Sequence, residues 1–159
     1  MATYSFVTTW RLDAPIEKVW EALYDSERWP SWWKGVEKVV ELKKGDENGI
    51  GSIRRYTWKS KLPYRLTFDM RLTKNEKPFK LEGAAQGELT GTGRWELGQD
   101  GPVTTARYYW DVSTTRRWMN LLTPIARPLF KWNHDVVMAQ GGEGIARLLG
   151  AKLRGDGES

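Results

Sequence analysis

The pattern of apolar residues restricts the fold of this chain most. In a series of segments apolar and polar side chains alternate, and one long segment with an apolar face follows them. In residues 63–73 nearly every second side chain is apolar and those between are polar, which is typical of a half-buried antiparallel strand. Similar patterns predict strands at 3–12, 35–43, 50–61, 78–87, 90–98 and 102–114. Short polar turns separate most of these strands, so neighbours in sequence are expected to pair as a curved antiparallel meander.

Two short helices are predicted after the first strand. Pro15 suits the first turn of a helix, and the apolar side chains that follow it recur at helical spacing. Ser26 is expected to cap the second helix, and Pro30 bounds or kinks it.

The segment 116–153 is predicted to be largely helical, with a short helix or loop near 116–122 and a long helix that starts around Pro124 to Pro128. Gly141 and Gly142 lie within the long helix, where each costs about 1 kcal/mol relative to alanine. We therefore expect a kink at this pair, or a group that packs unusually close to the helix.

Together these elements predict one α+β domain over residues 1–154 and a disordered tail at 155–159. A curved antiparallel sheet of about seven strands would wrap around the long C-terminal helix. Such a bent sheet leaves a space between itself and the helix, and the apolar face of the sheet lines that space.

The aromatic content of the chain points to a ligand site in this space. Ten tryptophans are more than a core of this size needs, and aromatic rings form flat, rigid walls of ligand pockets. The predicted inward faces of the strands carry Tyr56, Trp58, Tyr64, Phe68, Trp95, Tyr108 and Trp110. Plain core packing is the alternative for about half of them.

Composition and charge also limit the function. Cysteine is absent, which excludes disulfides, thiolate catalysis and cysteine–zinc sites, and no metal cluster or cofactor motif is recognisable. The net charge of +5 is spread along the chain, so we expect no nucleic-acid partner. No secretory signal or membrane-spanning run is visible, and a cytoplasmic location is expected.

Several short motifs, in this order, resemble those of a known family. They are Ala14-Pro15-Ile16 to Val19-Trp20, Trp29-Pro30-Ser31-Trp32-Trp33, Gly51, Pro63-Tyr64-Arg65-Leu66, Gly91-Thr92-Gly93-Arg94-Trp95 and Trp132-Asn133-His134. The chain resembles the START-like, or SRPBCC, superfamily over about residues 3–150, and within it the polyketide cyclase/dehydrase and lipid-transport group. The resemblance implies a helix-grip fold, like that of the birch-pollen allergen, with an internal pocket. It does not imply one reaction, because lipid carriers, receptors and cyclases all occur in this superfamily.

The candidate ligand-binding residues combine the aromatic wall with residues of the last helix and of the tryptophan-rich segment. They are Trp32, Trp33, Tyr56, Trp58, Tyr64, Phe68, Trp95, Tyr108, Trp110, Phe130, Asn133, His134 and Met138. His134 is the only histidine, and a hydrogen-bonded core role competes with a role in the pocket. Arg54, Arg94 and Arg107 are expected at the surface, although a buried arginine could bind a carboxylate or enolate.

Three functions remain open from the sequence. The first is a carrier or sensor of a hydrophobic molecule such as a lipid, quinone, isoprenoid or aromatic polyketide. The second is a cyclase or dehydrase in which His134 with Tyr56 or Tyr108 moves protons. The third is a protein-interaction module, which a large exposed apolar patch would support. The mixture of basic and aromatic residues in 116–132 additionally suggests transient contact with a membrane.

Overall fold

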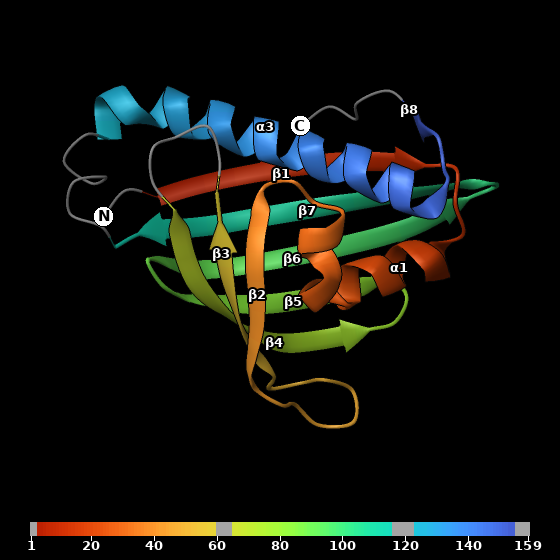
Figure 1. Cartoon of the computed structure of the whole chain (residues 1–159), viewed down its shortest axis with the longest axis horizontal. Helices are drawn as coiled ribbons and strands as arrows, with labels where there is room; N and C mark the ends of the chain where they lie inside the picture. The colour runs from red at the N-terminus through yellow and green to blue at the C-terminus, as the bar shows by residue number, and fades with distance from the viewer. Residues whose placement is uncertain (1–2, 60–64, 116–122, 155–159) are drawn as a thin grey trace.

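The computed structural model describes residues 3–59, 65–115 and 123–154 (Figure 1). The elements follow one another as β1 (Thr3–Leu12), α1 (Ile16–Tyr24), the 3-10 helix η1 (Ser26–Ser31), β2 (Val36–Lys43), β3 (Ile53–Trp58), β4 (Leu66–Glu76), β5 (Lys80–Gly87), β6 (Leu89–Asp100), β7 (Val103–Thr114), α3 (Thr123–Leu149) and β8 (Leu153–Arg154). The predicted helix or loop at 116–122 and the predicted tail at 155–159 lie outside the described residues.

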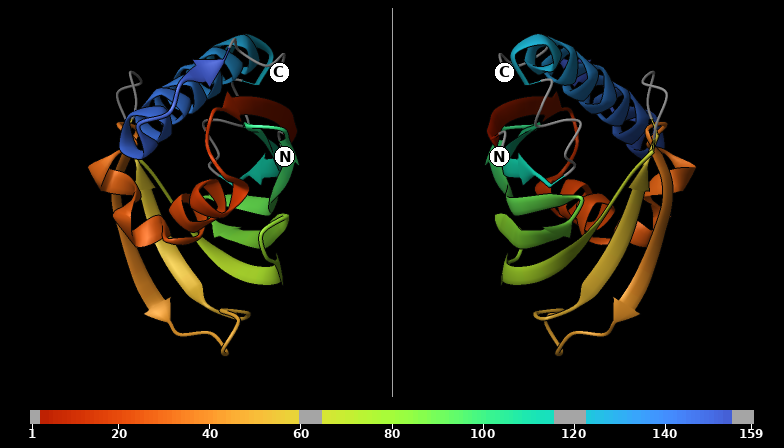
Figure 2. Two further views of the ribbon diagram at one scale, coloured as in Figure 1. Left: turned by 90° about the vertical axis from the view of Figure 1, so that its right-hand side faces the viewer. Right: turned by 90° about the vertical axis from the view of Figure 1, so that its left-hand side faces the viewer.

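The strands form one antiparallel sheet in the order β2-β3-β4-β5-β6-β7-β1-β8. Strands β2 to β7 are the predicted meander, and β1 returns to pair with β7 along its whole length. Figure 2 shows that the sheet curves into a trough, that α3 lies across its open side, and that α1 and η1 flank one end. The predicted α+β helix-grip fold is therefore confirmed.

Two details differ from the sequence-based expectations. The sheet has an eighth strand, because the two residues of β8 follow α3 and pair with Arg11 and Leu12 of β1. Ser26 does not cap η1: it is the first residue of that helix, and no side-chain cap bond is formed. Its hydroxyl instead accepts hydrogen bonds from side chains of β3, which fixes η1 against the sheet.

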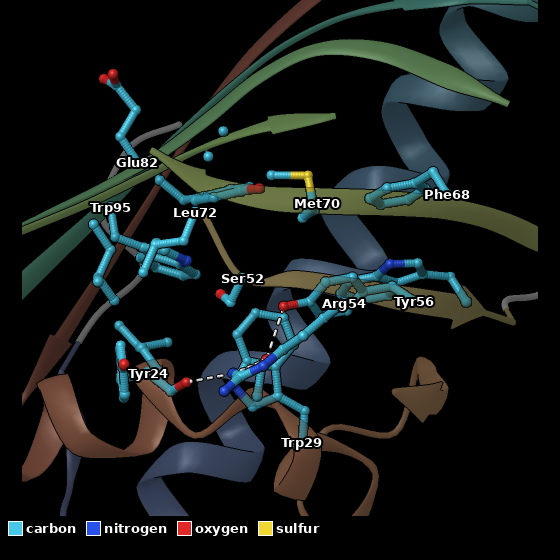
Figure 3. Close-up of a pocket in the computed structure, with 17 residues that line it drawn as sticks. Tyr24, Trp29, Ser52, Arg54, Tyr56, Phe68, Met70, Leu72, Glu82 and Trp95 are labelled. Carbon is cyan, nitrogen blue, oxygen red and sulfur yellow. Dashed lines mark hydrogen bonds between the residues drawn. The ribbon is translucent and has the colours of Figure 1, made fainter. Parts of the chain in front are cut away.

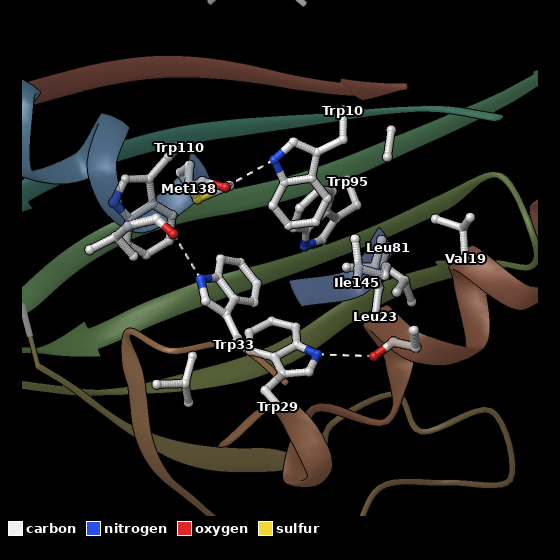
Figure 4. Packing of buried hydrophobic residues seen from close by; sticks show 14 of the residues in the cluster. Trp10, Val19, Leu23, Trp29, Trp33, Leu81, Trp95, Trp110, Met138 and Ile145 are labelled. Atoms are coloured by element: carbon white, nitrogen blue, oxygen red, sulfur yellow. Dashed lines mark hydrogen bonds between the residues drawn. The ribbon is translucent and has the colours of Figure 1, made fainter. Parts of the chain in front are cut away.

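Two indole rings press against α3 at its glycine pair. They belong to Trp10 and Trp33, and Figure 4 shows their indole nitrogens directed at backbone carbonyls. A Cβ at Gly141 would overlap the ring of Trp33 and crowd that of Trp10, and a Cβ at Gly142 would lie 3.0 Å from Trp10 Nε1. Trp10 Nε1 donates to the carbonyl of Met138 at 3.1 Å, and Trp33 Nε1 donates to that of Val137 at 2.9 Å. The expected close approach to the glycines is thus made by two tryptophans, which hold α3 against β1 and the segment after η1.

Among the described residues, no helix is both long and apolar enough to cross a membrane.

Candidate ligand-binding site

Two neighbouring cavities lie inside the trough of the sheet. One, of about 140 Å³, is lined by residues of α3, β1 and the central strands, and we call it the α3 cavity. The other, of about 100 Å³, is lined by residues of α1, η1 and strands β3 to β7, and we call it the α1 cavity. The side chains shared by both linings are Trp29, Trp58, Phe68, Trp95 and Tyr108. An aromatic partition therefore separates the two spaces.

Most of the predicted ligand-binding residues line the α3 cavity. These are Trp33, Trp58, Phe68, Trp95, Tyr108, Trp110, Phe130, Asn133, His134 and Met138. Inward alternation along β3, β4, β6 and β7 brings the sheet residues together, and helical spacing along α3 brings Phe130, Asn133 and Val137 to the same face. The wall is mainly aromatic and aliphatic, with a few polar groups, as in typical small-molecule sites.

The remaining predicted site residues lie elsewhere. Tyr56 lines the α1 cavity instead. Trp32 is outside both linings and packs against Trp29 and Trp33, with ring centroids 6.3 Å and 5.5 Å away. Tyr64 lies outside the described residues.

Several lining residues of the α3 cavity were missed by the sequence analysis: Tyr4, Phe6, Trp29, Leu66, Leu89, Val112, Thr114 and Val137. Tyr4 and Phe6 reach the cavity because β1 pairs with β7, so that Tyr4 lies opposite Val112 and Phe6 opposite Trp110. The alternation of residues 3–12 indicated a strand, but nothing in it indicated which strand would be its neighbour.

His134 packs on an aromatic ring in the α3 cavity. Its imidazole stacks on Phe6 with centroids 4.5 Å apart. Burial lowers the pKa of His134 to about 4, while the charge of Asp135 acts to raise that pKa and the charge of Lys131 to lower it. The ring is therefore neutral at pH 7, and its Nε2 is buried without a hydrogen-bond partner among the described residues.

This low pKa gives the stability of the protein a pH dependence. Between pH 6.5 and 4, the unfolded chain binds a proton at His134 that the folded protein does not, so stability falls as pH falls through this window. The loss amounts to about 3 kcal/mol at most. Urea unfolding of the wild type and of His134→Gln should show a flatter profile for the variant from pH 6.5 to 4. Parallel profiles would show that the imidazole is free to protonate in the folded state.

The α1 cavity has a polar corner built around Arg54 (Figure 3). Arg54 Nη1 donates to the carbonyl of Tyr24 at 2.8 Å and to Ser26 Oγ at 2.7 Å. Tyr56 donates its hydroxyl hydrogen to the same Ser26 Oγ at 2.8 Å. Burial raises the pKa of Tyr56, although the bond to Ser26 and the charge of Arg54 act to lower it. The corner thus joins β3 to the α1–η1 junction.

The expectation that Arg54 is a surface residue is wrong. Its side chain is only 17% exposed, because the α1–η1 junction covers this face of β3 and supplies the Tyr24 carbonyl and the Ser26 hydroxyl as acceptors for the guanidinium. Glu41 and Glu27 flank it, with nitrogen–oxygen distances of 3.7 Å and 4.0 Å. Arg94 pairs with Glu96 and covers the ring of Tyr109, and Arg107 is exposed; neither belongs to the lining of the α3 cavity or of the α1 cavity.

Within the described parts of the chain, no three His, Asp or Glu side chains gather in a way that could hold a metal ion.

Known proteins share both the sequence pattern and the fold. The family model described as "Polyketide cyclase / dehydrase and lipid transport" matches residues 3–154. The Zhui aromatase/cyclase from Streptomyces sp. R1128 superposes with a TM-score of 0.76 at 16% identity, covering 94% of each chain. A START superfamily protein from Mycobacterium smegmatis gives a TM-score of 0.75 at 13% identity, covering 92% of this chain and 97% of the other.

Comparison with curated protein sequences gives no match. The solved structures, at these low identities, show a shared fold, whereas the family model spans nearly the whole chain. The resemblance drawn from the sequence motifs is confirmed: the chain belongs to the polyketide cyclase/dehydrase and lipid transport family, with START-like structural neighbours.

Proposed function

We propose that this protein binds a hydrophobic small molecule between the sheet and α3, in order to carry or sense it. The observation that supports this most is the aromatic lining of the α3 cavity. The aromatic side chains of the partition also line the α1 cavity on their other side. A core that serves only stability is packed without such spaces, because the atoms that line a void lose van der Waals contacts. Family members that bind hydrophobic ligands support the same proposal.

The arrangement of the rings suits a flat ligand. Tyr108 and Trp110 lie nearly parallel, with an interplanar angle of 24° and centroids 5.7 Å apart. Phe68 tilts against Trp110 at 5.5 Å, and Trp95 against Tyr108 at 4.5 Å. Such walls stack on fused rings and conjugated chains, and each buried aromatic contact adds roughly 0.5–1.5 kcal/mol beyond area burial.

Trp58 provides the mutational test, because it lines both cavities and is only partly buried. Trp58→Ala should weaken binding of a neutral naphthalene fluorophore about tenfold or more, since burial of a large side chain against a ligand contributes about 1.5–3 kcal/mol. Trp132→Ala is the matched control, because Trp132 is 46% exposed and lines neither cavity. Fluorescence titration and thermal melting of both variants check this. A large fall in melting temperature with unchanged affinity would instead make Trp58 a core residue.

The cyclase or dehydrase alternative has one favourable observation, namely that His134 and Tyr108 line the same cavity. Proton transfer at pH 7 is most efficient when the pKa of the acid or base is near 7. Burial instead lowers the pKa of His134 to about 4 and, with a contribution from Tyr56, raises that of Tyr108 well above its usual value. The third predicted catalytic residue, Tyr56, lines the other cavity and donates to Ser26. These features favour binding over catalysis.

Turnover of a synthetic poly-β-ketone thioester, followed by mass spectrometry, would decide between these functions. A product that has lost water, and that disappears in His134→Gln while affinity is kept, would establish the enzyme. The protein-interaction alternative has less support. The exposed large apolar side chains of the described residues are distributed over β1, β2, the β4–β5 turn and α3.

A further inference from the structure

Some polar atoms of the α3 cavity are buried without a hydrogen-bond partner. Trp58 Nε1, on β3, and Asn133 Oδ1 and His134 Nε2, on α3, lack a partner among the described residues. All three residues line this one cavity. Buried polar atoms in native proteins are nearly always hydrogen-bonded, and those that are not call for a specific reason. Their grouping around one cavity, from both β3 and α3, is what a bound molecule that supplies the missing partners would require.

These groups determine which hydrogen-bond donors and acceptors the ligand must carry. Trp58 Nε1 can only donate a hydrogen bond, and the carbonyl oxygen of Asn133 can only accept one. The neutral imidazole of His134 has one donor and one acceptor nitrogen, and the Tyr108 hydroxyl can do both. A ligand that satisfies them therefore carries at least one hydrogen-bond donor and one acceptor.

The charge of the ligand is restricted as well. No Asp, Glu, Lys or Arg occurs among the described residues that line the α3 cavity. An ion placed there would lose its hydration without gaining a charged partner, which is far more costly than burying a neutral group. The α1 cavity does not compensate, because Arg54 already bonds to Tyr24 and Ser26 and is flanked by Glu41 and Glu27.

We infer that the α3 cavity selects an uncharged ring compound whose hydroxyl group donates to Asn133 or His134 and whose acceptor oxygen faces Trp58. This inference rests on the proposed binding function and narrows it. Fatty-acid-like anions and plain hydrocarbons are then poor ligands. Phenols and hydroxylated fused rings are good ones.

A matched set of naphthalenes tests the inference by isothermal titration calorimetry at pH 7. The probes are 2-naphthol, which is neutral and has a hydroxyl donor, 2-methoxynaphthalene, which has only the acceptor, and 2-naphthoate, which is an anion. We expect 2-naphthol to bind at least tenfold more tightly than either of the others. Equal binding of naphthol and its methyl ether, or tightest binding of naphthoate, would overturn the inference while leaving the binding function intact. Binding of none of the three would overturn both.

Substitutions at Asn133 and His134 test whether these side chains cause the preference for 2-naphthol. The double substitution Asn133→Leu with His134→Leu should weaken binding of 2-naphthol at least fivefold more than it weakens binding of 2-methoxynaphthalene. The methyl ether is thus an internal control for the shape of the cavity. Equal losses for both compounds would show that these side chains only shape the wall. Thermal melting checks folding, and the comparison of ligands on the wild type stands even where the variant does not fold.

Discussion

Gly144→Ala is expected to lower the free energy of unfolding by about 2 kcal/mol or more. A Cβ at this position of α3 would overlap the backbone carbonyl of Trp32, which cannot rotate away as a side chain could. Overpacking of this kind costs about 1–3 kcal/mol and sometimes more. Alanine favours a helix over glycine by about 1 kcal/mol, so without the overlap the same change would stabilise the protein.

Urea unfolding of Gly144→Ala beside Gly98→Ala checks this expectation. Gly98 is exposed in β6, and a Cβ there would have no atom of the other described residues within 4 Å apart from its chain neighbours, so its substitution should be nearly neutral. A Gly144→Ala variant as stable as the wild type would mean that α3 does not lie as close to Trp32 as described. The close packing of α3, which forms one side of the cavity, would then be contradicted.

Trp33→Ala is expected to cost about 3–5 kcal/mol of stability, the range for removing a fully buried aromatic side chain. Trp33 is 1% exposed and contacts the rings of Trp10, Trp29 and Trp58 at centroid distances of 5.3, 4.9 and 5.2 Å. Its indole also donates to the carbonyl of Val137. The substitution therefore removes the ring that joins α3 to the aromatic partition, and ligand affinity should fall with stability.

Trp33→Phe separates the contribution of ring packing from that of the indole hydrogen bond, because phenylalanine keeps a ring but has no donor. It should lower the free energy of unfolding less than Trp33→Ala does. Trp132→Ala, at an exposed position on the same helix, should change stability by no more than about 0.5 kcal/mol. Chemical unfolding of the three variants measures these values. A Trp33→Ala protein that unfolds like Trp132→Ala would contradict the packing of α3 against the cavity.

The strands were predictable because their residues face either the cavity or water. In β4 and β7, apolar side chains that face the cavity alternate with polar ones that face water. The inward positions of Phe68 and Trp110 were therefore predictable from the sequence. The glycine pair of α3 also indicated close packing before its partners were known. These are local signals, which depend on residues near one another in the chain.

Other features depend on long-range contacts that no local pattern contains. Arg54 follows the inward alternation of β3, but only the α1–η1 junction, with the Tyr24 carbonyl and the Ser26 hydroxyl, makes a buried guanidinium tolerable there. Phe6 became a neighbour of His134 only through the position of β1 in the sheet. For His134, the sequence left a core role and a pocket role open. The structure places it on the cavity wall, with a buried nitrogen that has no hydrogen-bond partner among the described residues.

The proposal that the space under α3 holds a hydrophobic molecule is tested most directly by native mass spectrometry of the purified protein, with organic extraction of what it carries. We expect an adduct that denaturation releases, that extracts as an uncharged apolar compound, and that is depleted in Trp58→Ala but not in Trp132→Ala. An unliganded mass that stays unchanged after incubation with neutral fused-ring compounds and lipids would contradict the proposal. The cavities would then be packing voids of the fold rather than a binding site.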